Sequence, residues 1–282
     1  MLEIPESHTI SAQLNHTVQG KTIQTVYANS SPHGFAFYFG DPNRYPSLLT
    51  GRSIDGAKAV AGMVEIAAGE MRVVLSDGAN LRYLAPGAPR PPKHQLYLEF
   101  EDQSALVCTI QMYAGLWAFE EGENRNPYYL AAQGKPSPLS SAFDAAYFAR
   151  LLGSVKPALA VKPFLATEQR IPGLGNGVLQ DILFNARINP KTTLDALSDV
   201  EKEALLYSIK QTLAEMTAQG GRDTEKDLFG RSGGYATLLS NKTLKWPCPV
   251  CGGSIVKQAY LGGSVYYCPT CQPVKKGVQR AA

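Results

Sequence analysis

The stretch CPVCGGSIVKQAYLGGSVYYCPTC, residues 248–271, holds two Cys-x-x-Cys pairs with sixteen residues between them. Zinc favours four thiolates in a tetrahedron, and each Cys-x-x-Cys turn supplies two of them. Residues 254–260 and 264–267 are predicted strands joined by a turn at Gly262-Gly263, so a hairpin would bring the two pairs together. The stretch therefore predicts a zinc ribbon with four ligands: Cys248, Cys251, Cys268 and Cys271.

Two other uses of paired cysteines are a disulfide and a redox Cys-x-x-Cys motif. Both suit this chain poorly, because we expect it in the cytoplasm and four of its five cysteines fall in this one arrangement. All four predicted ligands are cysteines, which leaves no open coordination position for water, and a ribbon of this size does not fold without metal. We therefore expect a structural zinc. Cys108, inside a predicted strand, is expected to be a core thiol.

Helical patterning dominates the region before the ribbon, from residue 136 to residue 240. Apolar residues between Leu194 and Met216 recur at a spacing of three to four, which indicates an amphipathic helix. Ser198, with Glu201 three residues later, is the predicted N-cap of this helix. The stretch KPSPLSSAFD, residues 135–144, contains the proline and serine residues typical of a linker and marks where the pattern changes.

The first 135 residues are rich in short β-like runs. After a helical signal at residues 5–14, clusters of Gly, Asn, Asp and Pro separate predicted strands at residues 22–27, 34–39, 59–66, 70–75, 95–100 and 105–112. Strands followed by helices are typical of an α+β chain with separate domains. We therefore predict a β-sandwich domain at residues 1–135, a helical domain at 136–240 and the zinc ribbon at 241–282.

Charge is distributed unevenly between the two halves of this 282-residue chain. Residues 1–135 carry 10 Lys/Arg and 13 Asp/Glu, whereas residues 136–282 carry 17 and 11. From Leu228 onward there are seven basic residues, the last of them Arg280, and no acidic one. A one-sided basic region fits a polyanionic partner, since Lys and Arg release counterions when they contact phosphates. A basic surface that is merely solvated is the alternative reading.

The start of the chain, MLEIPESHTI, lacks the basic and apolar regions of a signal peptide. No apolar run reaches the roughly 18 residues of a membrane span. We therefore expect a cytoplasmic protein, nucleoid-associated if it is bacterial, and a monomer.

A glycine-rich loop, IPGLGNG at residues 171–177, lies between two predicted helices. Gly173 and Gly175 permit tight turns and close backbone approach, and a helix that starts after Asn176 would present free N–H groups. Asn176 adds an amide donor, and Lys162 in the preceding helix adds positive charge. These features suit a phosphate, although many Gly-x-Gly-Asn loops only connect helices.

Together these motifs resemble the Fpg/Nei family of DNA glycosylases. The N-terminal MLEIPESHTISAQL is similar to the family's Met-Pro-Glu-Leu-Pro-Glu start, and residues 162–190 resemble its helix–two-turns–helix. Residues 220–235, GGRDTEKDLFGRSGGY, stand where the family has its base-capping loop, and residues 247–272 resemble its zinc finger. The resemblance covers residues 1 to about 273 in the family's order, and four motifs together make it specific.

The resemblance implies a two-domain protein that binds duplex DNA in the cleft between the domains. Family members flip a damaged base, attack the sugar C1′ with the amine of an N-terminal proline, and form a Schiff base. A glutamate beside the proline handles protons, and a lysine in the β domain supports the chemistry. Here Glu3 matches the glutamate, and Lys162, Gly175 and Asn176 match the phosphate-binding positions. Lys257 of the zinc ribbon is a further candidate DNA contact.

Four positions depart from the family pattern. Leu2 stands at the proline position, and Met63 stands at the lysine position. The loop that wedges into the base stack, Pro-Arg-Arg-Phe-Gly in the family, is Gln-Met-Tyr-Ala-Gly at residues 111–115, and Gly263 replaces the arginine at the hairpin tip. The resemblance thus retains the scaffold and the phosphate contacts, and it loses most of the catalytic and base-wedging positions.

The α-amine of Met1 is a candidate nucleophile beside Glu3. A leucine at position 2 is expected to prevent removal of Met1, and an α-amine with a pKa near 7.7–8.0 is partly neutral at pH 7. This amine lies one residue beyond the proline position, on the order of 3.5 Å away, and about 1 Å can cost a hundredfold in rate. We therefore expect weak abasic-site lyase activity or none. Glu3 has a structural reading as well, as a first-turn carboxylate favoured by the helix dipole.

The sequence thus predicts a DNA-binding protein of the Fpg/Nei fold that binds duplex DNA, or damaged or abasic DNA, in the cleft between the domains, with glycosylase chemistry weak or lost. One alternative is an active base-excision glycosylase or AP lyase that uses Met1 and Glu3. Another is a binding module for RNA or for a protein partner, built on the same fold.

Overall fold

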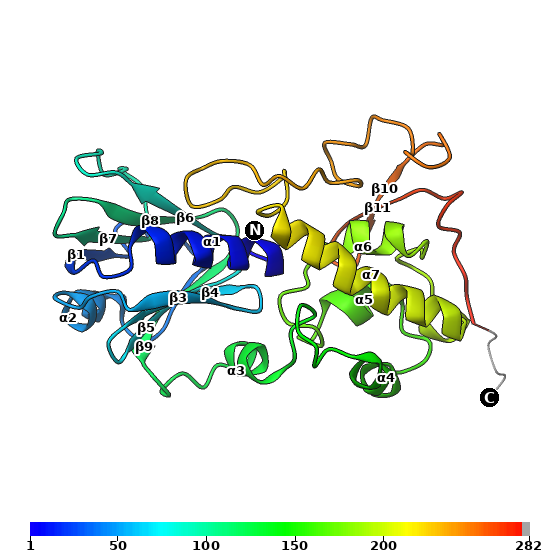
Figure 1. Cartoon of the computed structure of the whole chain (residues 1–282), viewed down its shortest axis with the longest axis horizontal. Coiled ribbons are helices and arrows are strands. Elements are labelled where there is room, and N and C mark those ends of the chain that lie inside the picture. Colours follow the sequence, from blue (N-terminus) through cyan, green and yellow to red (C-terminus); the bar gives the residue numbers. More distant parts are fainter. Residues whose placement is uncertain (278–282) are drawn as a thin grey trace. The chain divides into compact units, whose positions relative to one another are not determined.

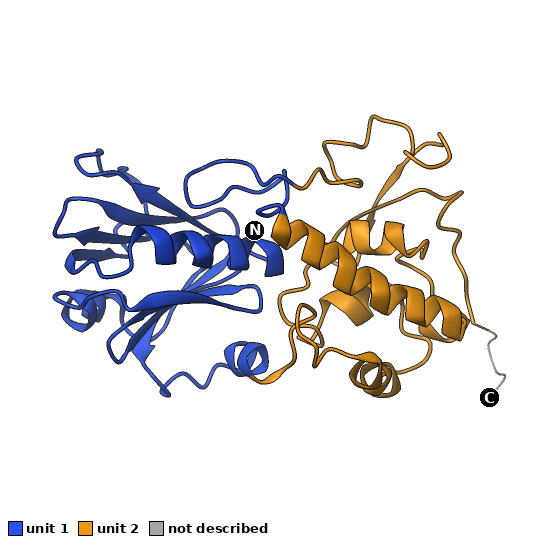
Figure 2. Cartoon of the chain, viewed as in Figure 1, with its two compact units in different colours: residues 1–133, 219–234 blue, residues 134–218, 235–282 orange. Residues whose placement is uncertain are grey.

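The computed structural model describes residues 1–277, so Arg280 of the basic C-terminal region lies outside the described residues. The chain forms two compact units (Figure 2). Unit 1 consists of residues 1–133 and 219–234, and unit 2 consists of the remainder. Residues 219–234, which the sequence assigns to the helical domain, are therefore part of the same unit as the strands. Within residues 1–277, none of the helices combines the length and apolar character that crossing a membrane requires.

Unit 1 contains two β-sheets and a long N-terminal helix, α1 (Ile4–Thr17) (Figure 1). One sheet has the strand order β1-β7-β8-β6 and the other β2-β9-β5-β4-β3. The strands are β1 (Ile23–Ala28), β2 (Ala36–Tyr38), β3 (Gly56–Val60), β4 (Met63–Ala68), β5 (Met71–Leu75), β6 (Ala79–Leu84), β7 (Leu96–Phe100), β8 (Ala105–Ile110) and β9 (Ala114–Glu120). Three short helices complete the unit: η1 (Pro42–Arg44), α2 (Tyr45–Leu49) and α3 (Pro127–Gly134), the last of which ends at the border with unit 2.

The core of unit 1 lies between the sheets and under α1. Ile10 and Leu14 of α1 pack there with apolar residues from both sheets, and Cys108 is a buried member of the same cluster. Burial raises the pKa of the Cys108 thiol to about 12, as expected of a core thiol. Leu228, from the segment 219–234, is fully buried in this core, and its carbonyl accepts a hydrogen bond from the backbone N–H of Tyr83 at 2.9 Å. Because Tyr83 belongs to the edge strand β6, the segment covers that edge.

Two features of the strand prediction were wrong. The run predicted as one strand at residues 59–66 is the hairpin β3–β4, which turns at Ala61-Gly62 with Ala61 at φ 53°. Strands β6 and β9 were missed. The side chains of β9 are buried along six of its seven residues, so the alternation that reveals a half-exposed strand is absent from its sequence.

Unit 2 is helical, with one β-hairpin. Its elements are α4 (Ala145–Gly153), α5 (Val161–Ala166), α6 (Leu179–Asn185), η2 (Leu194–Ala196), α7 (Asp199–Ala218), β10 (Val256–Tyr260) and β11 (Gly263–Tyr267). The predicted cap of α7 is confirmed: Glu201 N–H donates to Ser198 Oγ at 3.3 Å, and Ser198 N–H donates to the Glu201 carboxylate at 3.0 Å. This is a capping box, which satisfies two helix-end donors.

The hairpin β10–β11 turns one residue earlier than predicted. Tyr260 pairs with Gly263, so the two turn residues are Leu261 and Gly262, with φ angles of 47° and 74°. Positive φ at both positions is the geometry of a type I′ turn, which matches the twist of the strands. Gly263 therefore lies in β11, and the exposed side chain at the tip is Leu261.

Candidate active site and nucleic-acid interface

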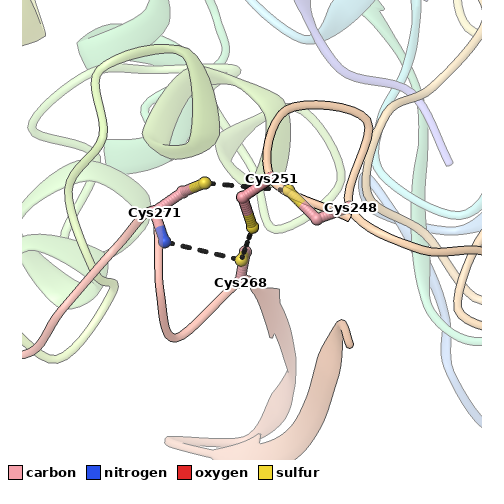
Figure 3. A group of neighbouring side chains, drawn as sticks. All are labelled: Cys248, Cys251, Cys268 and Cys271. Carbon is pink, nitrogen blue, oxygen red and sulfur yellow. Dashed lines mark hydrogen bonds between the residues drawn. The ribbon is translucent and has the colours of Figure 1, made fainter. Parts of the chain in front are cut away.

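The four predicted zinc ligands converge in unit 2 (Figure 3). Their sulfur atoms all lie within 4.8 Å of one another, with 3.8 Å between Cys248 and Cys271 and 3.4 Å between Cys251 and Cys268. Four thiolates at about 2.3 Å from a tetrahedral zinc would be about 3.8 Å apart. The donor set and its spacing therefore fit a structural zinc ion.

A buried glutamine joins the zinc knuckles to the helical region. The Gln272 side chain accepts from Cys268 N–H at 3.0 Å and donates to the Ile188 carbonyl at 2.9 Å. The Asn189 amide in turn donates to the Gln272 carbonyl at 2.8 Å. The ribbon and the helices of unit 2 are thus linked by fully buried polar groups, which are costly to separate.

Lys162 lies in α5 and is only 4% exposed. Its ammonium group donates to the carbonyl oxygen of Tyr260 and, at 3.3 Å, to that of Leu261. Burial lowers the pKa of Lys162 below its ordinary value. The predicted phosphate ligand therefore holds the turn of the zinc hairpin, with one ammonium N–H beyond these two bonds.

Asn176 contacts the same hairpin from the glycine-rich loop. Its side-chain amide donates to the Ser264 carbonyl at 3.0 Å, and its buried Oδ1 has no hydrogen-bond partner among the described residues. Gln180 of α6, which the sequence analysis did not single out, donates to Ser264 O at 3.2 Å and accepts from Tyr266 N–H at 2.9 Å. Its place next to the glycine-rich loop, four residues after Asn176, was the signal that could have identified it.

The remaining predicted DNA contacts lie close to this group. Gly175 belongs to the same loop and accepts from Leu179 N–H at 3.3 Å, so α6 begins three residues after Asn176. Lys257 projects from β10, where it is exposed and donates to Asn241 Oδ1 at 3.1 Å. The structure thus gathers Lys162, Asn176 and Lys257 around one hairpin.

In unit 1, the nitrogen at the family's proline position is a backbone amide. Leu2 N–H donates to the Asp77 carbonyl at 2.6 Å, and the Leu2 side chain is buried in the core. An amide nitrogen shares its lone pair with the carbonyl group. It therefore cannot act as the nucleophilic amine that the family's chemistry uses.

Met1 provides a free amine one residue earlier. Its α-ammonium forms an ion pair with the Glu225 carboxylate, which comes from the segment 219–234. Both partners are partly exposed. The amine would have to leave this ion pair before it could approach a carbonyl carbon.

Glu3 is the N-cap of α1 and belongs to a buried ion cluster. Glu3 and Glu6 form a capping box, in which each side chain accepts from the other residue's backbone N–H. Arg222 Nη2 lies 3.4 Å from Glu3 Oε2 and 2.9 Å from Glu6 Oε2, and all three side chains are at most 5% exposed. Burial disfavours the charged guanidinium, but the Glu3 and Glu6 carboxylates outweigh it and raise the pKa of Arg222. Nothing in the sequence pattern pointed to Arg222.

The other departures from the family pattern take two forms. Met63 begins β4 and is 8% exposed, packed in an apolar cluster with Trp117 and Tyr129. By contrast, Met112 and Tyr113 between β8 and β9 are 59% and 46% exposed. The lysine position is thus part of a small core. In the wedge loop, Met112 and Tyr113 are at the surface, whereas Ala114, at the phenylalanine position, is buried.

Comparisons with known proteins agree with this description. Residues 135–227 match the "Formamidopyrimidine-DNA glycosylase H2TH domain", and residues 247–274 match the "Zinc finger found in FPG and IleRS". The chain is 29% identical to a formamidopyrimidine-DNA glycosylase of Symbiobacterium thermophilum, over 99% of this chain and 91% of the relative. It is also 29% identical to that of Geobacillus kaustophilus, over 96% of this chain and all of the relative.

Solved structures show the same architecture. The Fpg (MutM) protein of Thermus thermophilus superposes with a TM-score of 0.81 at 26% identity, over 96% of this chain and 99% of that one. Lactococcus lactis Fpg in complex with abasic-site DNA superposes with a TM-score of 0.81 at 23% identity, with the same coverage. With the zinc-finger match and the four converging thiols, the predictions of fold and structural zinc are confirmed. The chain belongs to the Fpg (MutM) family of DNA-repair glycosylases, with that family's DNA-binding domains and zinc finger.

Proposed function

We propose that this protein binds duplex DNA as a monomer, favours abasic or damaged sites, and has lost the proline-dependent base excision of its family. DNA binding is supported by the helix–two-turns–helix and zinc-finger matches and by the Lactococcus lactis relative, whose structure contains abasic-site DNA. The excess of basic residues in residues 136–282 supports it further, because phosphate neutralisation supplies most of the affinity of such proteins.

The loss of base excision rests on one observation, the Leu2 amide at the proline position. Its N–H is committed to the Asp77 carbonyl at 2.6 Å, and the Leu2 side chain fills part of the core. A Schiff base requires an amine with a free lone pair. The residue that begins the family's reaction is thus replaced by a group that cannot begin it.

The surroundings of Glu3 support the same conclusion. In a general acid–base role, a carboxyl group must lie within hydrogen-bond reach of the proton that it transfers. The Glu3 carboxylate is instead buried 3.4 Å from Arg222 Nη2, and in the capping box it accepts a backbone N–H. We infer that Glu3 chiefly stabilises the start of α1 and the segment 219–234.

An abasic-site lyase that uses Met1 is the second candidate. It is favoured by the partly exposed α-ammonium of Met1, which precedes Glu3 by two residues. An abasic site exposes an aldehyde without any base extrusion, so it is the least demanding substrate for such an amine. The ion pair with Glu225 opposes this reaction, because it must be broken before the amine can reach the aldehyde.

The two candidates are separated by one experiment on untagged protein with its native N-terminus. Binding to intact, abasic and oxidised-purine duplexes is measured by fluorescence anisotropy, and borohydride trapping is performed on the same duplexes. We expect binding to all three, tightest for the abasic duplex, with no covalent product from the oxidised duplex. A trapped product on abasic DNA that disappears when the amine is acetylated would identify the lyase. Efficient excision of the oxidised purine would contradict our proposal.

A further inference from the structure

Trp246 is the feature of unit 2 that DNA binding through the hairpin does not explain. It is 58% exposed, whereas the other tryptophan of the chain, Trp117, is 8% exposed in the core. A single exposed apolar side chain is ordinary, but tryptophan is enriched at interfaces, where its large ring contributes contact area. Trp246 stands two residues before Cys248, the first zinc ligand, so the zinc site fixes the segment that carries it.

The segment around Trp246 is anchored at both ends. At one end, Leu238 and Leu239 N–H groups both donate to the carboxylate of Asp181 in α6, each at 2.8 Å. At the other end, Cys248 N–H donates to the Gly253 carbonyl at 2.7 Å. Leu239 and Cys248 are both buried in one apolar cluster with Phe184 of α6. Residues 240–247 therefore form a bridge between two fixed points.

The bridge is also ordered internally. Thr243 is 9% exposed, and its hydroxyl accepts from Ser240 N–H at 2.8 Å. The backbone N–H of Trp246 donates to the Thr243 carbonyl at 2.9 Å. Pro247 follows, and a proline restricts the backbone of the residue before it. The indole is therefore presented to solvent on a rigid backbone, which reduces the entropy lost when a ligand stacks on it.

Lysines are frequent on this bridge and on the strand hydrogen-bonded to it. Lys242 and Lys245 are exposed on the same bridge, and Lys257 connects to it by a hydrogen bond to Asn241 Oδ1 at 3.1 Å. No acidic residue occurs in the sequence from Leu228 to the C-terminus. An exposed aromatic ring among lysines is the combination that binds nucleic acid, because the lysines contact phosphates and the ring stacks on a base.

We propose that Trp246 stacks on an unpaired nucleobase of a single-stranded segment adjoining the duplex, with Lys242, Lys245 and Lys257 binding the neighbouring phosphates. The inference rests on the proposed DNA binding and specifies one preferred substrate class. In an intact duplex each base face is covered by its neighbours, so an indole held at the surface meets an open face only at a gap, a tail or a bubble. Stacking tolerates any base, so the preference is for structure and not for sequence.

Tryptophan fluorescence and anisotropy test this inference together. Full-length zinc-loaded protein is titrated with a blunt duplex, with the same duplex carrying a short single-stranded tail, and with a tailed RNA duplex. The variants are Trp246→Ala, Trp246→Phe and, as matched control, Tyr207→Ala. Tyr207 is also an exposed aromatic residue of unit 2, at 68%, but it lies on α7 beside Glu203.

We expect the tailed DNA to quench the parent's fluorescence and the quenching to vanish in Trp246→Phe. Trp246→Ala should bind the tailed DNA roughly 5- to 150-fold more weakly than the parent, which corresponds to one lost stacking contact. Trp246→Phe should lose less affinity for the tailed DNA, because it retains an aromatic face. Tyr207→Ala should bind every duplex like the parent.

Three outcomes would contradict, respectively, the proposed DNA binding, the assignment of Trp246 and the choice of DNA as its ligand. Parent protein that binds neither DNA would refute the proposed function itself. Blunt and tailed DNA bound equally by the parent and by Trp246→Ala, without quenching, would overturn only the assignment of Trp246. Tighter binding and stronger quenching with tailed RNA than with tailed DNA would overturn the choice of DNA as the ligand.

Discussion

Arg222 donates hydrogen bonds from Nε and Nη2 to the two carboxylate oxygens of Glu6, at 3.0 and 2.9 Å, and from its backbone N–H at 3.1 Å. The two residues are 216 positions apart in the chain, and both are buried. Bidentate pairing of this kind fixes orientation as well as distance. The start of α1 and the segment 219–234 are thereby held together as one piece of unit 1.

Replacing Arg222 with alanine should strongly destabilise unit 1. The change leaves the carboxylates of Glu3 and Glu6 buried without their cation, a situation that typically costs about 3–5 kcal/mol. Urea unfolding monitored by circular dichroism measures the loss. Arg231→Ala is the matched control, because Arg231 is an exposed arginine of the same segment. Equal stability of the two variants would show that the ion cluster contributes little.

Leu228→Ala should destabilise unit 1 as a core substitution does, although Leu228 lies in a segment without helix or strand. Its side chain is fully buried among residues of both sheets, and such truncations cost about 2–5 kcal/mol. The neighbouring Phe229 is 40% exposed and serves as the control. Phe229→Ala should have a clearly smaller effect on the same unfolding curve. A negligible effect of Leu228→Ala would mean that the segment is not anchored in solution.

Leu2→Pro should restore covalent trapping on abasic DNA. A proline at position 2 is small enough for Met1 to be removed, which places a secondary amine where the Leu2 amide now stands. The amine of this N-terminal proline can still donate to the Asp77 carbonyl, as the Leu2 amide does. Leu2→Ala, which places a primary amine at the same position, is the control and should trap less. The proposed loss of chemistry is wrong if the parent already traps as much product as Leu2→Pro, as judged by gel analysis after borohydride reduction.

The zinc ribbon should bind one zinc per chain, and removal of any one of its four ligands should abolish zinc binding. Cys248→Ala removes a buried thiol of the site, and Cys108→Ala removes the one cysteine outside it. Metal analysis should find zinc in Cys108→Ala and little in Cys248→Ala. DNA binding should follow the metal content, because the hairpin that Lys162 and Asn176 contact lies between the two ligand pairs.

Thiol alkylation provides an independent measure of the same site. Chelation of the zinc should unfold the ribbon, so its four cysteines should react at pH 8, whereas Cys108 in the folded core of unit 1 should not. Burial raises the pKa of Cys108 to about 12, so its reactive thiolate should be about one part in ten thousand at that pH. Rapid labelling of Cys108 in the native protein would contradict the packing described here.

Lys162→Ala should weaken DNA binding for every sequence alike and flatten the salt dependence by about one unit. Lys156→Ala is the control, since Lys156 is an exposed lysine in the same unit. Lys162 also donates to two carbonyls of the hairpin turn, so its loss has a second route to weaker binding. The two routes are separable: weaker binding with an unchanged salt slope would assign Lys162 to holding the hairpin and would count against a phosphate contact.

Features that depend on local sequence were predictable. The spacing of the four cysteines identified the zinc ribbon, because each ligand pair is a single turn. Ser198 and Glu201 were recognised as a cap, because the capping box involves residues three positions apart. The DNA-contact roles of Lys162, Gly175, Asn176 and Lys257 and the catalytic roles of Met1 and Glu3 remain predictions.

Features that depend on distant residues were not predictable in this way. Arg222 follows two glycines, and its buried partners Glu3 and Glu6 are more than 200 residues away in the chain, so no periodicity connects them. Strand β9 is buried almost throughout, so its apolar run had no strand-like alternation. The hairpin turn was predicted one residue too late, because a leucine with positive φ, such as Leu261, is uncommon. Each error has the same origin: tertiary contacts outweighed local preference.

The burial of Leu228 in unit 1 also has a consequence for synthesis on the ribosome. The first 133 residues of this unit leave the ribosome well before residue 228; at about 5–20 residues per second the delay is on the order of 5–20 s. During that time the backbone N–H of Tyr83 on the edge strand β6 and the core position of Leu228 both lack their partner. A nascent sheet with an open edge is prone to associate with other chains. The nascent chain should therefore depend on chaperones until residue 228 has been synthesised, even if the complete folded protein is stable.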